Sequence, residues 1–156
     1  MATLLTYYFN NPVSEAELLD DILKHIPTEL IKSRKKDGLS LFDLKQAAER
    51  KGYKAYGVKL KNSSLLKLSV PILIYLETED YKHFAILKGI KEDRFFLADP
   101  RRGNIRISAD RFIKEWKGKL ALVLYKKNYK PQKHNLSIAE KILLRPELKA
   151  VKITGF

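Results

Sequence analysis

The N-terminal part of the chain carries apolar side chains at the spacing of helices. Within residues 2–9 they recur every three or four positions, which predicts a helix; they are Leu4, Leu5, Tyr8 and Phe9. Asn10-Asn11-Pro12 ends this helix, because asparagine and proline favour a turn. Ser14 followed by Glu17 is a capping box, which predicts a second helix that continues past Leu23.

A further helix is predicted over residues 41–51. Ser40 and Asp43 supply the polar groups that cap its first turn. Gly52 stands where a glycine commonly ends a helix. Between the two capped helices, residues 33–38 are basic and polar, and we expect a loop there.

From residue 53 onward the apolar period becomes that of strands. Alternating or continuous apolar runs predict strands at residues 53–60, 72–76, 83–90, 94–98 and 119–125, and Arg106-Ile107 is compatible with a further short one. Short helices are expected over residues 63–68 and from Ser108 through Phe112 to Trp116. Helices followed by a mostly antiparallel sheet predict an α+β domain with N-terminal helices packed on the sheet.

Length and composition fit one globular domain. The chain has 156 residues, 45% of them apolar, and no apolar run approaches the eighteen or so residues of a membrane span. We expect the domain to cover residues 1–125 and a basic tail to cover 126–156, with a short amphipathic helix over residues 137–144. The chain contains no cysteine, which excludes disulfides, thiolate metal sites and thiol catalysis from these residues. No pattern implies a cofactor or a metal.

The formal net charge is +13, and it is distributed along the chain. A basic protein can bind nucleic acid, anionic lipid or acidic peptide. No zinc-finger pattern and no aromatic ribonucleoprotein motif accompanies the charge, so a solvated lysine-rich surface is the simpler interpretation. A nucleic-acid-binding module is kept as a remote alternative.

Three histidines are candidates for chemistry, and two of them have structural interpretations. His25 is expected at the C-terminal end of a helix, where a positive side chain suits the helix dipole. His134 lies in the polar tail. His83 differs because it begins a strand of a predicted hairpin, opposite a carboxylate.

The hairpin predicts that His83 lies beside Asp99. If Lys91-Glu92 forms a two-residue turn, His83 faces Pro100 and is adjacent to Asp99. Opposed residues of an antiparallel pair have Cβ atoms roughly 4.5–5.5 Å apart. A carboxylate at that distance can fix the tautomer of a catalytic histidine. The alternatives are a simple cross-strand salt bridge, or a turn in which Asp99 accepts bonds from backbone amides.

Six segments follow one another in a recognisable order and spacing. They are residues 11–19 (NPVSEAELL), 38–45 (GLSLFDLK), 52–57 (GYKAYG), 83–87 (HFAIL), 97–103 (LADPRRG) and the helix after Ser108. In this order and spacing they closely resemble the double-glycine leader peptidase domain, a papain-like cysteine peptidase found at the N-terminus of bacteriocin- and peptide-exporting ABC transporters, and sometimes alone. The resemblance runs from about residue 2 to residue 125.

The resemblance assigns roles to two residues and finds two missing. His83 matches the family's catalytic histidine, and Asp99 matches the acid that orients it. The family's nucleophile, in a Cys-Gly-Pro or similar motif, would lie about five residues before Met1, and a Gln that helps form the oxyanion hole lies further upstream. Without a thiolate we expect no useful hydrolysis, since losing the nucleophile of a triad costs on the order of a millionfold in turnover.

Two explanations account for the missing cysteine. Either the chain begins inside the nucleophile helix, or the domain has degenerated into one that only binds substrate. The resemblance implies a peptide substrate whose leader ends in Gly-Gly, with a peptide-exporting ABC transporter as a further partner. Both the cytoplasmic face of the inner membrane and the periplasm fit such a protein. Lys32, Arg34, Lys35 and Lys36 are candidates to meet an acidic leader, although solvated loop charges are the simpler interpretation.

Overall fold

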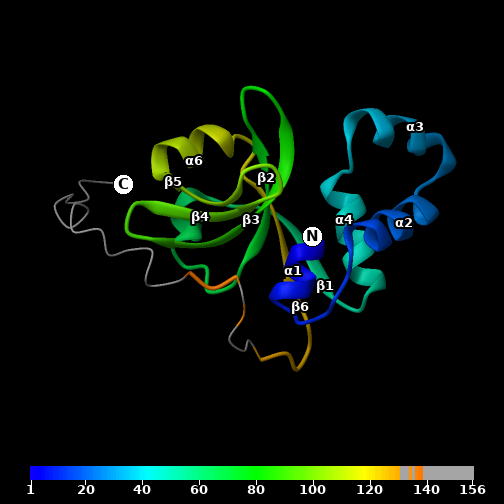
Figure 1. The fold of residues 1–156 in the computed structure, drawn as a ribbon, viewed down its shortest axis with the longest axis horizontal. Coiled ribbons are helices and arrows are strands. Elements are labelled where there is room, and N and C mark those ends of the chain that lie inside the picture. The colour runs from blue at the N-terminus through cyan, green and yellow to red at the C-terminus, as the bar shows by residue number, and fades with distance from the viewer. Residues whose placement is uncertain (131–133, 135, 139–156) are drawn as a thin grey trace.

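The structure is a computed structural model that describes residues 1–130, 134 and 136–138. Four helices precede the sheet, and two short helices lie between its strands (Figure 1). The helices are α1 (Ala2–Tyr7), α2 (Glu15–His25), α3 (Thr28–Asp37), α4 (Leu41–Arg50), α5 (Asn62–Leu65) and α6 (Ala109–Glu115). The strands are β1 (Lys54–Lys59), β2 (Ile72–Glu77), β3 (Lys82–Lys91), β4 (Arg94–Asp99), β5 (Gly103–Ser108) and β6 (Leu120–Tyr125).

Both predicted capping boxes are present. The amide of Ser14 donates to Glu17 Oε2 over 2.8 Å, and the amide of Glu17 donates back to Ser14 Oγ over 3.1 Å. Ser40 and Asp43 repeat the arrangement at the start of α4, with distances of 2.7 and 3.1 Å. Each box satisfies two amides that the first turn of a helix leaves without a partner, so α2 and α4 begin where the sequence predicts.

The loop predicted for residues 33–38 is wrong, because α3 covers Thr28–Asp37. None of the residues of α3 is buried, so the helix has no apolar stripe from which its period could be read. Pro27 at the N-cap and Gly38 with φ of +85° limit it instead. Arg34 pairs with the buried Asp43 of α4 at 2.7 Å and so ties α3 to its neighbour.

The sheet has six strands in the order β1-β6-β2-β3-β4-β5, and every described pairing is antiparallel. This confirms the predicted α+β arrangement. β5 is longer than Arg106-Ile107 alone, and it forms one edge of the sheet. β6 lies between β1 and β2, so the last described strand joins the first strand to the rest of the sheet.

The turn predicted at Lys91-Glu92 is wrong by one residue. Lys91 pairs with Arg94, so Glu92 and Asp93 form the turn, with Glu92 at φ of +55°. A β-bulge between Leu87 and Gly89 then shifts the register by one residue. Beyond the bulge Ile86 faces Ala98, and continuing that register sets Asp99 opposite Ala85 rather than beside a His83–Pro100 pair.

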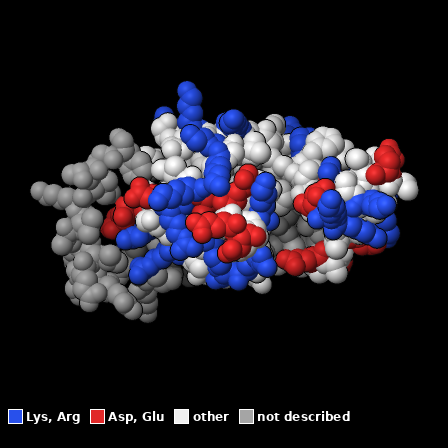
Figure 2. Space-filling view, turned by 90° about the horizontal axis from the view of Figure 1, so that it is seen from above, with Lys and Arg blue, Asp and Glu red and all other residues white. Residues whose placement is uncertain are grey.

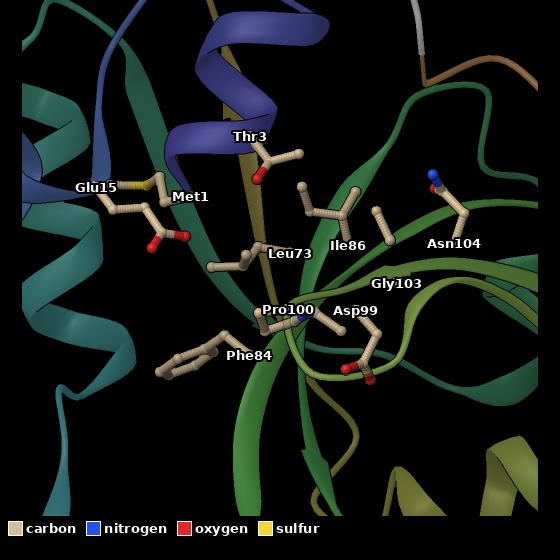
Figure 3. Close-up of a pocket in the computed structure, with 12 residues that line it drawn as sticks. Met1, Thr3, Glu15, Leu73, Phe84, Ile86, Asp99, Pro100, Gly103 and Asn104 are labelled. Atoms are coloured by element: carbon tan, nitrogen blue, oxygen red, sulfur yellow. The ribbon is translucent and has the colours of Figure 1, made fainter.

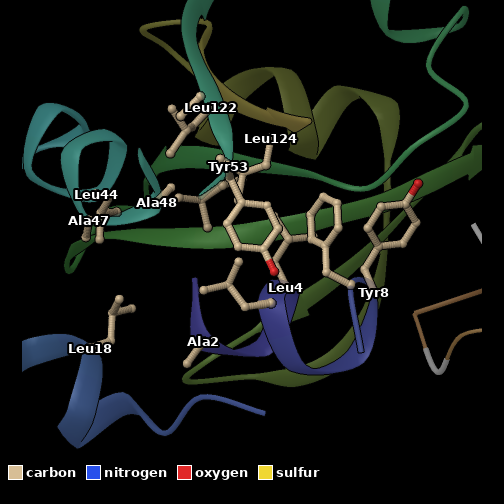
Figure 4. Close-up of a cluster of buried hydrophobic side chains, with 14 of the residues drawn as sticks. Ala2, Leu4, Tyr8, Leu18, Leu44, Ala47, Ala48, Tyr53, Leu122 and Leu124 are labelled. Atoms are coloured by element: carbon tan, nitrogen blue, oxygen red, sulfur yellow. The ribbon is translucent and has the colours of Figure 1, made fainter. Parts of the chain in front are cut away.

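Two apolar clusters cover the two faces of the sheet. On one face α1, α2 and α4 pack against Leu73, Ile86, Leu122 and Leu124. Figure 4 shows Leu4 of α1, Tyr8 just after α1, and Tyr53 in that cluster. On the other face Phe112 and Trp116 pack with Ile74, Leu87 and Leu97. α6 begins beside the β3–β4 turn, where the amide of Ala109 donates to the backbone oxygen of Asp93 over 3.1 Å, and its last residue, Glu115, reaches Arg102 in the loop that follows β4.

The described part of the tail packs against α1. The Tyr129 hydroxyl donates to the backbone oxygen of Tyr8, the rings of Tyr8 and His134 lie 4.8 Å apart, and Leu136 is buried. Residues 139–144 of the predicted tail helix lie outside the described residues. Within the part of the chain that the structure describes, no helix combines the length and apolar character needed to cross a bilayer.

Candidate active site

His83 and Asp99 meet at one end of the β3–β4 pair. His83 is the second residue of β3 and Asp99 the last residue of β4. Since Asp99 continues the register opposite Ala85, and His83 lies two residues from Ala85 on the same face of β3, the two side chains are diagonal neighbours. His83 Nε2 lies 2.7 Å from Asp99 Oδ2. The His83 side chain is 9% exposed and that of Asp99 is 0% exposed.

Four neighbouring donors hold the Asp99 carboxylate. Its Oδ1 accepts from the amides of Arg101 and Arg102 at 2.9 and 3.0 Å, and its Oδ2 accepts from the Arg102 side chain as well as from His83. Burial alone would raise the pKa of Asp99, but the bonds from His83, from the two amides and from Arg102 lower it from 3.8 to about 2. The acid is therefore a carboxylate at neutral pH.

The hydrogen bond fixes which nitrogen of His83 carries the proton. An ionised carboxylate can only accept, so Nε2 must donate to Asp99. In the neutral ring Nδ1 then carries the free lone pair. Nδ1 is buried, and among the described residues it has no hydrogen-bond partner. It is the atom of this pair that can accept a proton from a reacting group.

An aromatic ring packs against the histidine. The Tyr81 and His83 ring centroids lie 4.7 Å apart with the planes tilted by 49°. The guanidinium carbon of Arg101 lies 4.1 Å from the centroid of Tyr81. The contact with Tyr81 restricts rotation of the imidazole, and Arg101 in turn holds Tyr81.

A cavity of ≈ 380 Å³ lies between the start of α1 and the neighbouring end of the sheet. Met1, Thr3 and Glu15 line it on one side, and the side chains of Leu73, Phe84 and Ile86 on the other (Figure 3). Figure 3 also shows the Asp99 carboxylate turned away from Thr3 and Ile86. The cavity adjoins the backbone of Asp99 and Pro100, while the carboxylate lies toward the α6 side of the sheet.

The structure therefore brings together the two site residues named from the sequence, and their catalytic roles remain predictions. Sequence reasoning missed the groups around them, Tyr81, Arg101, Arg102 and Glu115. Of these, only the contact of Arg102 could have been predicted, since Arg102 follows Asp99 by three residues in a turn. The basic candidates all lie on α3, which Figure 1 shows apart from β3 and β4, and one of them, Arg34, is engaged with Asp43 on α4; they are Lys32, Arg34, Lys35 and Lys36.

No metal centre accompanies the pair. Across residues 1–130, 134 and 136–138, no three His, Asp or Glu side chains come together as metal ligands could.

The chain matches known peptidase sequences. The model of the Peptidase C39 family matches residues 1–128. The chain is 30% identical over 124 residues to the "Probable functional amyloid protease FapD" of Pseudomonas fluorescens, covering 80% of this chain and 54% of that protein. It is 31% identical over 120 residues to the "Lactococcin-G-processing and transport ATP-binding protein LagD" of Lactococcus lactis, covering 70% of this chain and 17% of that protein. The chain thus spans about half of one relative and a small part of the other.

Solved peptidase domains share the fold. The peptidase domain of Streptococcus ComA, a bi-functional ABC transporter, superposes with a TM-score of 0.61 at 22% identity, covering 76% of this chain and 82% of that domain. A double glycine motif protease from an AMS/PCAT transporter, solved in complex with the leader peptide, superposes with a TM-score of 0.50 at 24% identity, covering 75% and 80%. The predicted relationship to double-glycine leader peptidase domains is confirmed at the level of family and fold.

Proposed function

Because the chain belongs to the Peptidase C39 family, we propose that it supplies the His–Asp half of a double-glycine leader peptidase site and binds the leader peptide. The observation that carries this proposal is the hydrogen bond between His83 and Asp99, in which Nε2 donates to the carboxylate and Nδ1 is left free to take a proton. This arrangement is what a thiol nucleophile requires from its base.

The proposed reaction uses His83 as base and then as acid. Nδ1 takes the proton of a family cysteine, and Asp99 stabilises the resulting imidazolium. The thiolate attacks the carbonyl carbon of the second Gly, and the proton passes from Nδ1 to the leaving amine as the peptide C–N bond breaks, which leaves the leader joined to the cysteine as a thioester. Water then releases the leader as a free acid and restores the thiol. The cysteine belongs at the N-terminal end of an extended α1, where five further residues add about 7.5 Å of helix.

Two relatives support the proposed substrate and partner. One is named for processing and transporting lactococcin G, and the other is a double glycine motif protease from a transporter, solved with a leader peptide. The proposed substrate is therefore a peptide with a double-glycine leader, and the proposed partner is a peptide-exporting ABC transporter. FapD, the relative of which the chain covers more, is named as a functional amyloid protease, so a secreted amyloid subunit with such a leader is a substrate of the same chemical class.

A second candidate function is peptide binding without cleavage. It is the function open to the 156 residues by themselves, since they hold no cysteine and Ser and Thr hydroxyls at other places cannot replace the family's thiol. The reading frame upstream of the Met1 codon separates the two candidates. An in-frame Cys-Gly-Pro preceded by a Gln supports the peptidase, and unrelated residues support the binding domain.

Binding of a fluorescent leader peptide to the 156-residue chain tests the function that both candidates share. We expect saturable binding to an amphipathic leader that ends in Gly-Gly, and weaker binding when Val-Val replaces the pair, since a narrow groove that reads the backbone excludes side chains. Equal binding of both peptides, or no binding, would contradict the proposal.

Nucleic acid serves as the competitor in the same assay. On the face shown in Figure 2, acidic side chains lie between the basic ones, an arrangement that favours a peptide over a polyanion. We expect DNA neither to displace the leader peptide nor to bind with an affinity that falls steeply as the salt concentration rises. A steep fall would favour the nucleic-acid-binding alternative instead.

A further inference from the structure

The Asp99 oxygen that accepts from His83 is also held by Arg102. Arg102 Nε donates to Asp99 Oδ2 over 2.9 Å, and its Nη2 lies 2.8 Å from the same oxygen. The guanidinium group also forks onto Glu115, with Nη1 to Oε1 at 3.0 Å and Nη2 to Oε2 at 2.8 Å. One planar group therefore joins the acid of the site to a carboxylate of α6.

Glu115 is itself fixed in place. Its side chain is largely buried, and it accepts from Arg111 Nε at 2.8 Å one turn earlier in α6. The helix that carries Glu115 begins with the side chain of Ser108 accepting from the amide of Arg111. Phe112, on the same helix, is fully buried against the sheet. Hence the packing of α6 on the sheet fixes the position of Glu115, and Glu115 in turn fixes Arg102.

The charges along this chain of contacts alternate, which keeps each group ionised. Hydrogen bonding to Glu115 raises the pKa of Arg102, burial lowers it, and Asp99 raises it further, with a net rise. Burial alone would raise the pKa of Glu115, but Arg102 and Arg111 lower it overall. A lone arginine beside Asp99 would compete with the imidazole for the carboxylate charge. Glu115 offsets that positive charge while leaving the hydrogen bonds of Arg102 in place.

We infer that Arg102, held by Glu115, is a positioning residue that fixes the Asp99 carboxylate and thereby keeps the His83 proton on Nε2. The catalytic meaning of this inference rests on the proposed function, whereas its geometry lies within the described residues. The planar fork is the essential property. Lysine keeps the charge but cannot donate in one plane to both carboxylates.

The test is ¹⁵N NMR of His83 in the 156-residue chain, which reports the imidazole tautomer and the solvent exchange of the Nε2 proton. We expect the unmodified chain to show one tautomer and a slowly exchanging Nε2 proton. Arg102→Gln, Arg102→Lys and Glu115→Gln should each speed that exchange and lower the tautomer ratio by about tenfold, as expected when a charge-assisted hydrogen bond is lost.

Two substitutions at distant ion pairs serve as matched controls. Arg94→Gln removes an arginine at the far end of β4, where it pairs with Asp93, and Glu49→Gln removes a glutamate that pairs with Lys45 on α4. Both should leave the His83 signals unchanged. Backbone spectra and thermal unfolding confirm that each variant is folded, and Glu115→Gln, which preserves the shape of the side chain, carries the test if Arg102→Gln does not fold.

Two results would overturn the inference. Unchanged His83 signals in folded Glu115→Gln and Arg102→Gln would show that the hold of Arg102 on Asp99 does not reach the imidazole. An Arg102→Lys chain that behaves like the unmodified chain would show that charge alone suffices. Neither result involves a peptide, so leader binding by the same samples tests the proposed function separately.

Discussion

His83 and Asp99 are sixteen residues apart in the chain and lie 2.7 Å apart through Nε2 and Oδ2. Neither side chain depends on a ligand for this contact, because both are enclosed by β3, β4 and the turn after Asp99. The hydrogen bond between the two side chains is thus formed before any substrate binds. Its effect on the stability of the protein can therefore be measured without a catalytic assay.

The depressed pKa of Asp99 predicts a stability contribution that is lost in acid. The folded pKa is about 2 and the ordinary value is 3.8, so the contribution is fully present above pH 3.8 and disappears as the pH falls toward 2. The difference in unfolding free energy between the unmodified chain and Asp99→Asn should therefore be about 2 kcal/mol larger at pH 6 than at pH 2. Urea unfolding across this range measures it.

Asp93→Asn is the control for that measurement. Asp93 is a partly exposed carboxylate in the β3–β4 turn, so the difference between Asp93→Asn and the unmodified chain should vary little over the same pH range. A difference for Asp99→Asn that is constant with pH would mean that the carboxylate is not specially stabilised.

Removing a buried side chain of α1 should lower the stability of the whole domain, because α1 packs on the sheet. Leu4 is fully buried, and Leu4→Ala should lower the free energy of unfolding by about 2–5 kcal/mol, because it removes apolar contacts and leaves a cavity. Phe42→Ala, at a side chain that is 60% exposed, should change it by less than about 0.5 kcal/mol. Equal losses in chemical denaturation would contradict the described packing.

The two capping boxes should differ in strength although their bonds are alike. Asp43 is buried and also pairs with Arg34, so Asp43→Ala removes a helix cap and leaves a guanidinium group without its partner, at a cost of about 1–3 kcal/mol. Glu17→Ala removes the equivalent group from an exposed box and should cost less. Thermal unfolding of both variants decides the order, and the reverse order would argue against the tie between α3 and α4.

The β-bulge provides a test of how the tail packs. Gly89 has φ of +158°, which L side chains rarely adopt, and a Cβ added there would lie 2.8 Å from Ile138 Cδ1, so Gly89→Ala should destabilise the chain by about 1–3 kcal/mol through backbone strain together with crowding. Ile138→Ala should relieve part of that cost in the double variant, which a double-mutant cycle of unfolding free energies detects. A strictly additive cycle would show that the two residues are not in contact.

The sequence predicts those parts of the fold that local chemistry specifies. The Ser14–Glu17 and Ser40–Asp43 boxes mark helix starts, and the alternation of apolar residues marks the strands. α3 could not be predicted from an apolar stripe, because none of its residues is buried. Pro27 and Gly38 set its ends, and the Arg34–Asp43 pair ties it to α4.

The pairing of His83 with Asp99 was predicted despite an incorrect turn. The turn lies one residue later than expected, and the bulge before Gly89 changes the register again. The pair still forms because diagonal neighbours on one face of a sheet are close enough for an imidazole to reach a carboxylate. The ion pair between Arg102 and Glu115 could not be predicted from the sequence, since it depends on how α6 packs on the sheet.

Cleavage of a leader peptide tests the central claim most directly. The 156-residue chain is extended at its N-terminus so that a helical segment carries Cys-Gly-Pro at the family's spacing with the Gln upstream, and the products from a synthetic double-glycine leader peptide are identified by mass spectrometry. We expect a cut after Gly-Gly that falls by at least about a thousandfold in His83→Ala and in the Cys→Ala version of the extension. A folded, extended chain that binds the leader but leaves it intact, or that cuts equally well without His83, would contradict the assignment of this pair as the base of the peptidase.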